Sequence, residues 1–170
     1  MAPLVPDRGC GTCAVCCTAL KIDDPALSKD AGVRCSHLTS VGCGVYETRP
    51  GACRAFFCAW RYLPTLDASW RPDRSGVLIG FVDRDDGAAL RLSTQTPEAI
   101  LQGFVVDFIV KTVNRGAPIY FTYSPAKGHG YKTFLNDRIS VPAKYNDMSK
   151  VSEILLAIMR EQADLRGAAT

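Results

Sequence analysis

The stretch that decides the fold of this chain is GVLIGFVDRDDGAALRLS, residues 76–93. Two apolar, β-prone runs flank DRDDG, a cluster of turn-forming residues, and this arrangement is typical of a β-hairpin. The carboxylates of Asp83, Asp85 and Asp86 lack the longer spacing and the terminal Glu of a calcium loop, which favours a simple turn. The stretch therefore predicts two antiparallel strands over roughly residues 76–93.

The residues that follow the hairpin, TPEAILQGFVVDFIVKTVNRG, predict an amphipathic helix. Thr96 stands at the N-cap, Pro97 at the first helical position and Gly116 at the stop. Because its apolar residues recur at helical spacing, we expect this helix to pack a broad face against the hairpin. Those apolar residues are Ile100, Leu101, Phe104, Val105, Phe108, Ile109 and Val113.

The carboxy-terminal sequence predicts one more strand and one more helix. APIYFTYS gives a strand near residues 117–124, and DMSKVSEILLAIMREQADLRG gives a terminal helix. Its apolar stripe holds Val151, Ile154, Leu155 and Ile158. Strand, strand, helix, strand and helix form an α+β pattern. We expect residues 73–170 to form this α+β part, joined in one compact unit to a cysteine-rich module over residues 1–72.

All eight cysteines lie between Cys10 and Cys58, and residues 59–170 contain none. CGTCAVCC, residues 10–17, places Cys10, Cys13 and Cys16 at C-x2-C-x2-C spacing, which lets successive thiolates turn toward one ion or cluster. Adjacent side chains of an extended backbone point to opposite sides, so Cys17 is expected to face away from Cys16. It would then serve a second site or the core.

The other four cysteines, at wider spacings, require the segment to fold back on the first loop. They are Cys35, Cys43, Cys53 and Cys58. Metal ligation, disulfides, and buried or redox-active free thiols are the three possibilities. We favour metal, because no basic stretch followed by an apolar leader opens the sequence, and clustered thiols of a cytoplasmic protein are kept reduced. Zinc and iron, as an ion or an iron–sulfur cluster, and one site or two, remain open alternatives.

Composition narrows the class of protein. The chain has 170 residues, 47% of them hydrophobic and 22% charged, with a mean hydropathy of +0.02, as in an ordinary globular domain. No apolar run approaches the roughly 20 residues of a membrane span, so no membrane partner and a cytoplasmic location are expected. The net charge of +3 comes from 20 basic residues spread among 17 acids, a pattern that does not favour nucleic acid.

Several other residues invite a functional interpretation. A turn histidine such as His37 is more often solvated than ligating, and the glycine-flanked loop around His129 lacks a phosphate-loop pattern. Arg49 and Arg54 either donate hydrogen bonds to thiolate sulfur or pair with Glu47. The aromatic residues near the last cysteine are expected to cover the module rather than to stack on bases. They are Phe56, Phe57, Trp60, Tyr62 and Trp70.

CGTCAVCC, followed by CSHLTSVGCGVYETRPGACRAFFC, resembles the cysteine-cluster family with the C-x-x-C-x-x-C-C motif, a zinc- or iron-chelating domain typified by bacterial YkgJ-like proteins. The resemblance covers about residues 10–60 and implies metal binding without naming a reaction. A similar cluster appears in flagellin lysine methylases, where an iron–sulfur cluster is implicated, and this likeness favours iron.

Three functions follow from these observations. The first is a metal-binding protein whose closed thiolate site is structural or carries electrons. The second is an iron–sulfur-dependent enzyme of methyl or electron transfer, although no sequence motif of a nucleotide or methyl donor accompanies the cysteines and no catalytic residue is assigned. The third is a metal-delivery or interaction module with a protein partner.

Overall fold

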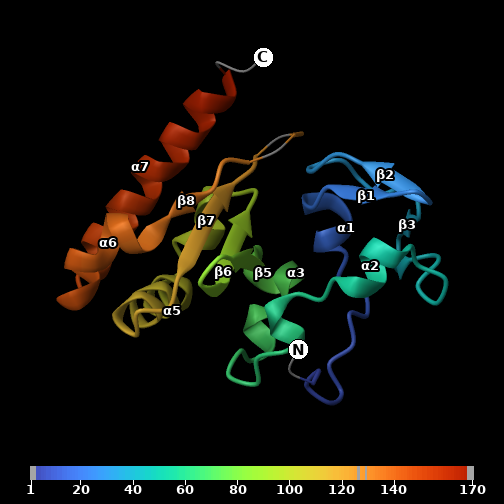
Figure 1. The fold of residues 1–170 in the computed structure, drawn as a ribbon, viewed down its shortest axis with the longest axis horizontal. Coiled ribbons are helices and arrows are strands. Elements are labelled where there is room, and N and C mark those ends of the chain that lie inside the picture. Colours follow the sequence, from blue (N-terminus) through green and yellow to red (C-terminus); the bar gives the residue numbers. More distant parts are fainter. Residues whose placement is uncertain (1–2, 126, 129, 168–170) are drawn as a thin grey trace.

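A four-stranded sheet forms the centre of the computed structural model, which describes residues 3–125, 127–128 and 130–167 (Figure 1). The strands are β5 (Val77–Arg84), β6 (Gly87–Thr94), β7 (Ile119–Tyr123) and β8 (Thr133–Phe134), in the order β5-β6-β7-β8. Strands β5 and β6 pair antiparallel from Val77↔Thr94 to Arg84↔Gly87. The predicted hairpin, with its acidic turn, is confirmed.

Strands β6 and β7 run parallel, so the chain between them must cross from one end of the sheet to the other. Two helices make this crossover, α4 (Pro97–Ile100) and α5 (Gly103–Asn114). The single helix predicted for residues 96–116 is therefore wrong. It breaks at Gln102, whose backbone is extended and whose side chain donates to the carbonyls of Ser75 (2.7 Å) and Ala99 (2.9 Å). Thr96 precedes α4, but its side chain makes no capping bond.

Two further helices complete the carboxy-terminal part, α6 (Leu135–Lys144) and α7 (Met148–Gly167). The terminal helix was expected, whereas α6 was not. Gln162 of α7 is buried and fixes that helix to the sheet, because its amide accepts from the backbone N–H of Tyr123 (2.6 Å) and donates to the carbonyl of Phe121 (3.2 Å). No described helix, the 20-residue α7 included, combines the length and the apolar character of a membrane span.

The hydrophobic core lies between the helices and one face of the sheet. Phe121 and Leu92 of the sheet, Ile109 of α5 and Leu155 of α7 are fully buried there. Most of the apolar positions that the helical pattern predicted are in this core or packed on it. Two tryptophans that precede the sheet, Trp60 and Trp70, join the same core. Trp70 also makes ring contacts with Phe104 and Phe108 of α5. Both tryptophans therefore have a packing role, as predicted, but in the core shared with the sheet and helices, and not as a cover of the cysteine-rich module alone.

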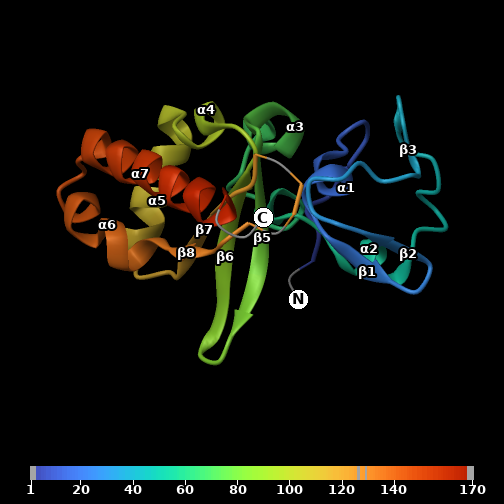
Figure 2. The same ribbon diagram turned by 90° about the horizontal axis from the view of Figure 1, so that it is seen from above.

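The cysteine layer, residues 3–58, lies across the sheet from α5, α6 and α7 (Figures 1 and 2). It is built from short elements: α1 (Val15–Ala19), β1 (Ile22–Asp24), β2 (Leu27–Lys29), β3 (Leu38–Thr39), β4 (Gly42–Cys43) and α2 (Gly51–Ala55). Three single turns, η1 (Ala59–Arg61), η2 (Ala68–Trp70) and α3 (Pro72–Ser75), connect it to β5. The molecule is thus a mixed α+β fold, as the sequence predicts.

Contacts at the beginning of the chain close the cysteine layer. Arg8 donates to the carbonyls of Trp60 (2.6 Å) and Leu63 (3.0 Å), and its guanidinium lies over the Trp60 ring at 5.2 Å. The backbone N–H of Val5 also donates to the carbonyl of Arg61 (2.7 Å). These bonds tie the first residues of the layer to the segment that follows its last cysteine.

Candidate functional site

The eight cysteines are all free thiols in the cysteine layer. Cys35 is buried and the other seven are half-buried. Cys10 and Cys13 lie in the turn before α1, Cys16 and Cys17 in α1, and Cys35 between β2 and β3. Cys43 ends β4, Cys53 lies in α2, and Cys58 precedes η1. Segments far apart in the sequence therefore bring their thiols into one layer.

One set of four, which we call the first thiol group, consists of Cys10, Cys13, Cys16 and Cys58. The backbone N–H of Cys13 donates to the carbonyl of Cys10 (2.9 Å), which closes the turn between them. Burial raises the pKa of Cys58 to about 11, and the neighbouring thiolates of Cys10 and Cys13 add to that rise. The pKa of Cys16 is raised first by a hydrogen bond with Cys17 and by burial, and then by the charges of Cys17, Cys10 and Cys13. Cys58 therefore lies near the loop that carries Cys10 and Cys13.

The remaining four, Cys17, Cys35, Cys43 and Cys53, form the second thiol group. The backbone N–H of Cys35 donates to the carbonyl of Cys17 (3.0 Å), and Leu38, which pairs with Cys43, donates to the carbonyl of Cys35 (3.1 Å). The pKa of Cys53 is raised, first by burial and then by the neighbouring Cys17, Cys35 and Cys43. By these backbone contacts and electrostatic neighbours we assign four of the eight thiols to each group.

The two groups meet at Cys16 and Cys17. These residues lie in the short helix α1, where adjacent side chains are not opposed as they are in a strand. Their side chains share a hydrogen bond that raises the pKa of Cys16 and lowers the pKa of Cys17. The expectation that Cys17 faces away from Cys16 is therefore wrong, because the local backbone is helical rather than extended.

Basic side chains accompany both thiol groups. Lys29 is anchored by the carbonyls of Thr18 (3.2 Å), Leu20 and Asp30, close enough for the thiolates of Cys35 and Cys17 to act on it. In the first group, Arg61 donates to the sulfur of Cys10, with 3.6 Å between Nη1 and Sγ. The sequence analysis missed both residues, although Arg61 follows Cys58 by only three positions.

Neither Arg49 nor Arg54, for which bonding to sulfur was one of two alternatives, donates to a sulfur atom among the described residues. The guanidinium of Arg49 lies over the ring of Tyr46 at 3.8 Å, near Cys17 and Cys53. Arg54 acts electrostatically on Asp24, whose carboxylate accepts from the N–H of Ala52. The alternative partner, Glu47, forms no ion pair with either arginine within the part of the chain that the structure describes.

Neither of the two histidines discussed in the sequence analysis is seen as a ligand in the described part of the structure. His37 accepts a hydrogen bond at its backbone carbonyl from Gly44 (2.9 Å), and His129 lies outside the described residues. As the side chains stand, no three Cys, His, Asp or Glu residues within 3–125, 127–128 and 130–167 form a group that could hold a metal ion. The donor chemistry still fits a metal, since four thiols are a complete set for tetrahedral zinc or an iron–sulfur cluster.

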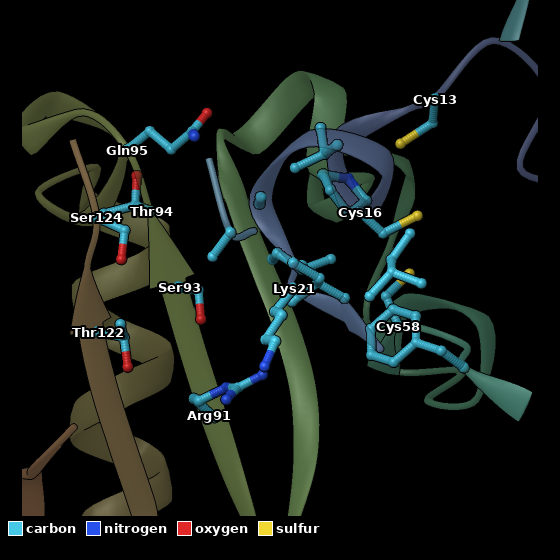
Figure 3. Close-up of a pocket in the computed structure, with 18 of the residues that line it drawn as sticks. Cys13, Cys16, Lys21, Cys58, Arg91, Ser93, Thr94, Gln95, Thr122 and Ser124 are labelled. Carbon is cyan, nitrogen blue, oxygen red and sulfur yellow. The ribbon is translucent and has the colours of Figure 1, made fainter. Parts of the chain in front are cut away.

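A pocket of about 650 Å³ lies between the cysteine layer and the sheet. Figure 3 shows Cys13, Cys16 and Cys58 on one side of it, and Arg91, Ser93 and Thr122 on the other. Apolar side chains, among them Val15, Phe56 and Leu78, line the space between. A cavity of this size takes a metabolite-sized molecule.

The polar wall of the pocket was not foreseen, although the sequence carries a signal for it. In β6, Leu90 and Leu92 alternate with Arg91 and Ser93, and in β7, Ile119 and Phe121 alternate with Tyr120 and Thr122. Alternation at period two puts one set on the core and the other on the opposite face. The sequence alone does not show that this second face lines a pocket, because that depends on which segment packs over it.

Comparisons with known proteins find no match to this chain among protein-family models, curated proteins or solved structures. The resemblance to the C-x-x-C-x-x-C-C family therefore stays a prediction. Functional conclusions rest on the residues of the site themselves.

Proposed function

We propose that this protein binds metal through two four-thiolate sites, one for each thiol group. The observation that carries the proposal is the division of eight free cysteines into two sets of four. In this arrangement Cys58 completes the set of Cys10, Cys13 and Cys16, whereas Cys17 belongs with Cys35, Cys43 and Cys53. A set of four thiolates leaves no ligand position open, which is typical of structural zinc and of electron-carrying iron–sulfur sites.

Each bound group would supply either folding free energy, as zinc does, or an electron-accepting centre, as an iron–sulfur cluster does. The chain's own residues would hold it and balance its charge. Lys29 stands beside the second thiol group and Arg61 donates to Cys10 in the first, so each group has a cation that offsets thiolate charge. The thiol side chains would have to rotate to bring the four sulfurs of each group to ligand distance, because no three of the described side chains form a metal-holding group as they stand.

Metal analysis of anaerobically purified protein, combined with its absorption spectrum, tests the proposal directly. Two zinc ions per chain, or iron with matching sulfide and a visible charge-transfer band, are expected. The variants Cys58→Ser and Cys35→Ser should each lose one site and keep the other, with His37→Ala as the matched control that loses neither. Full metal retention in both cysteine variants would contradict the proposal, and loss of all metal in either would indicate one shared centre.

Two other functions keep specific support. An iron–sulfur-dependent enzyme is favoured by the pocket, whose wall includes thiols of the first group. Metal delivery to a protein partner in the cytoplasm is favoured by the partial exposure of seven thiols. The rate of metal exchange with a competing chelator separates delivery from the structural function: delivery requires exchange within minutes, whereas a closed structural site exchanges far more slowly.

A further inference from the structure

The wall of the pocket formed by the sheet gathers polar side chains on one face. Arg91 pairs with Gly80, and Ser93 pairs with both Leu78 and Thr122, so these residues share a face of three adjacent strands. Gly80 leaves room on that face, because a Cβ atom there would meet only Phe56, at 3.8 Å. A polar patch on a sheet face that is covered by another layer needs partners for its polar atoms.

Arg91 is the central residue of this patch and has no partner among the residues that the structure describes. It is half-buried, its Nε is inaccessible to solvent, and none of its nitrogens donates to any residue that the structure describes. Burial alone lowers the pKa of its guanidinium, and no carboxylate of the described residues offsets that cost. An arginine held in this way favours an oxyanion, which a guanidinium binds through two parallel hydrogen bonds.

A second polar atom on the same wall is also without a partner. The hydroxyl of Thr122 is buried and forms no hydrogen bond with the described residues. It lies on the strand next to Ser93, whose hydroxyl makes no hydrogen bond within the described part of the chain. The patch therefore offers a guanidinium and two hydroxyl groups to a molecule in the pocket.

The charged residues that line the pocket carry more positive than negative charge, which also favours an anion. Of the described residues that line it, the charged ones are Lys21, Arg49, Asp73 and Arg91. The one carboxylate among them, that of Asp73, is held by two hydrogen bonds from Arg71, of 2.6 and 2.5 Å. Lys21 pairs with the exposed Asp23 at 3.2 Å, and its side chain points toward Arg91 across the pocket (Figure 3). Two cations that point toward each other favour an anion between them.

We infer that this pocket binds a small organic oxyanion, a carboxylate or phosphate, whose charged group lies between Arg91 and Lys21 and whose body lies against the apolar side chains beside the thiols. The hydroxyl groups of Ser93 and Thr122 would fix its orientation. This inference does not depend on the metal. A different role for Arg91, as a countercharge to metal-bound thiolates, is the alternative that the experiment must separate from anion binding.

Isothermal titration calorimetry of the full chain with inorganic phosphate and with succinate, at matched ionic strength, tests the inference. At least one of the two probes should bind with one-to-one stoichiometry, and the probe that binds tells phosphate from carboxylate. Arg91→Gln should weaken that binding at least tenfold. The matched control is Arg115→Gln, at an exposed arginine beyond α5, which should leave it unchanged.

Metal content and thermal stability, measured in the same variants, separate the outcomes. Unchanged metal with lost anion binding in Arg91→Gln supports the inference, whether or not the proposed thiolate sites are correct. Thr122→Val is a second test, because removing an unpartnered buried hydroxyl should leave stability intact while it weakens the probe severalfold. Binding of neither probe to the native protein, equal binding to Arg91→Gln, or loss of metal in that variant without any anion binding in the native chain would overturn it.

Discussion

The cysteine layer and the part of the chain that follows it, residues 59–167, are ordered by different means. In the cysteine layer the buried hydrophobic residues are Ile22, Ala31 and Cys35, and neither α1 nor α2 buries a single residue. The hydrophobic core begins at Ala59 and continues into α7. A segment that buries so little apolar surface does not balance its loss of chain entropy by burial alone. We propose that metal bound by its eight thiols supplies the remainder.

The largest expected effect follows from removing the metal that we propose. A chelator under reducing conditions should expose the backbone amides of residues 10–55 to hydrogen exchange, while β5, β7, α5 and α7 stay protected. The reason is that metal binding in such modules is largely folding free energy, about 10–16 kcal/mol for zinc in small peptides. Exchange measured by mass spectrometry checks this, and zinc or iron reconstitution should restore protection. Unchanged protection in the cysteine layer would mean that it folds without metal.

The second-largest effect is expected in the hydrophobic core of residues 59–167. Phe121→Ala removes a fully buried ring from β7 and should lower the free energy of unfolding by about 3–5 kcal/mol, from lost burial and the cavity left behind. Denaturant titration measures the change. Val141→Ala, at a residue of α6 that is 68% exposed, is the control and should change stability by less than about 0.5 kcal/mol. Metal content should be the same in both variants, and its loss in Phe121→Ala would show that the two regions are coupled.

Two glycines, one in the cysteine layer and one in α5, allow the stability of the two regions to be compared through smaller effects. Gly42, next to Cys43, has a φ of +117°, and a Cβ atom there would lie 3.0 Å from the carbonyl oxygen of Gly11. Gly42→Ala should therefore destabilise the cysteine layer by roughly 1–3 kcal/mol and weaken metal retention. Gly103→Ala, where α5 begins with open space around it, should instead stabilise the protein by about 0.5–1 kcal/mol. Thermal melts of the two variants that shift in the same direction would contradict this contrast.

The smallest effect is expected on the helical surface. Arg138 of α6 and Glu161 of α7 form a two-bond ion pair of 2.9 and 2.7 Å, but both side chains are more than one-third exposed. Arg138→Gln should cost only about 0.2–1 kcal/mol, and less in high salt. Denaturant titrations at low and high salt measure this. A loss as large as that of Phe121→Ala would mean that the pair, and not the core, holds α6 against α7.

The sequence was sufficient where one local signal dominated. The hairpin of residues 77–94 follows from its turn and its flanking apolar runs, and α7 follows from a long apolar stripe. The sequence was insufficient where contacts with distant residues determine where a helix breaks or how it is positioned. The break at Gln102 depends on the carbonyl of Ser75, and α6 contains Pro142 and is positioned by Asn136, whose amide bonds to Ile119 and Ala117.

In the candidate site, too, local sequence predicts one part, and contacts between distant segments determine the rest. The spacing of Cys10, Cys13 and Cys16 identifies three of the four thiols that we assign to the first thiol group. It gives no indication that Cys58, more than forty positions later, joins them, because that neighbourhood depends on how the intervening chain returns. Local sequence also cannot predict that Arg91 lacks a partner within the described part of the chain, since a partner can come from any element packed on its face.

The hydrogen bonds from Arg8 to Trp60 and Leu63 have a consequence for the metal binding that we propose. Arg8 and Trp60 lie 52 positions apart, so their contact closes a large ring of chain around all eight cysteines. Closing a ring of that size costs about 4 kcal/mol of entropy in a free chain. Because Trp60 belongs to the core, we expect the ring to stay closed when its interior loosens. An ion bound as we propose would then meet Cys10 and Cys58 already held near each other, and its capture would be a local event on a tethered loop.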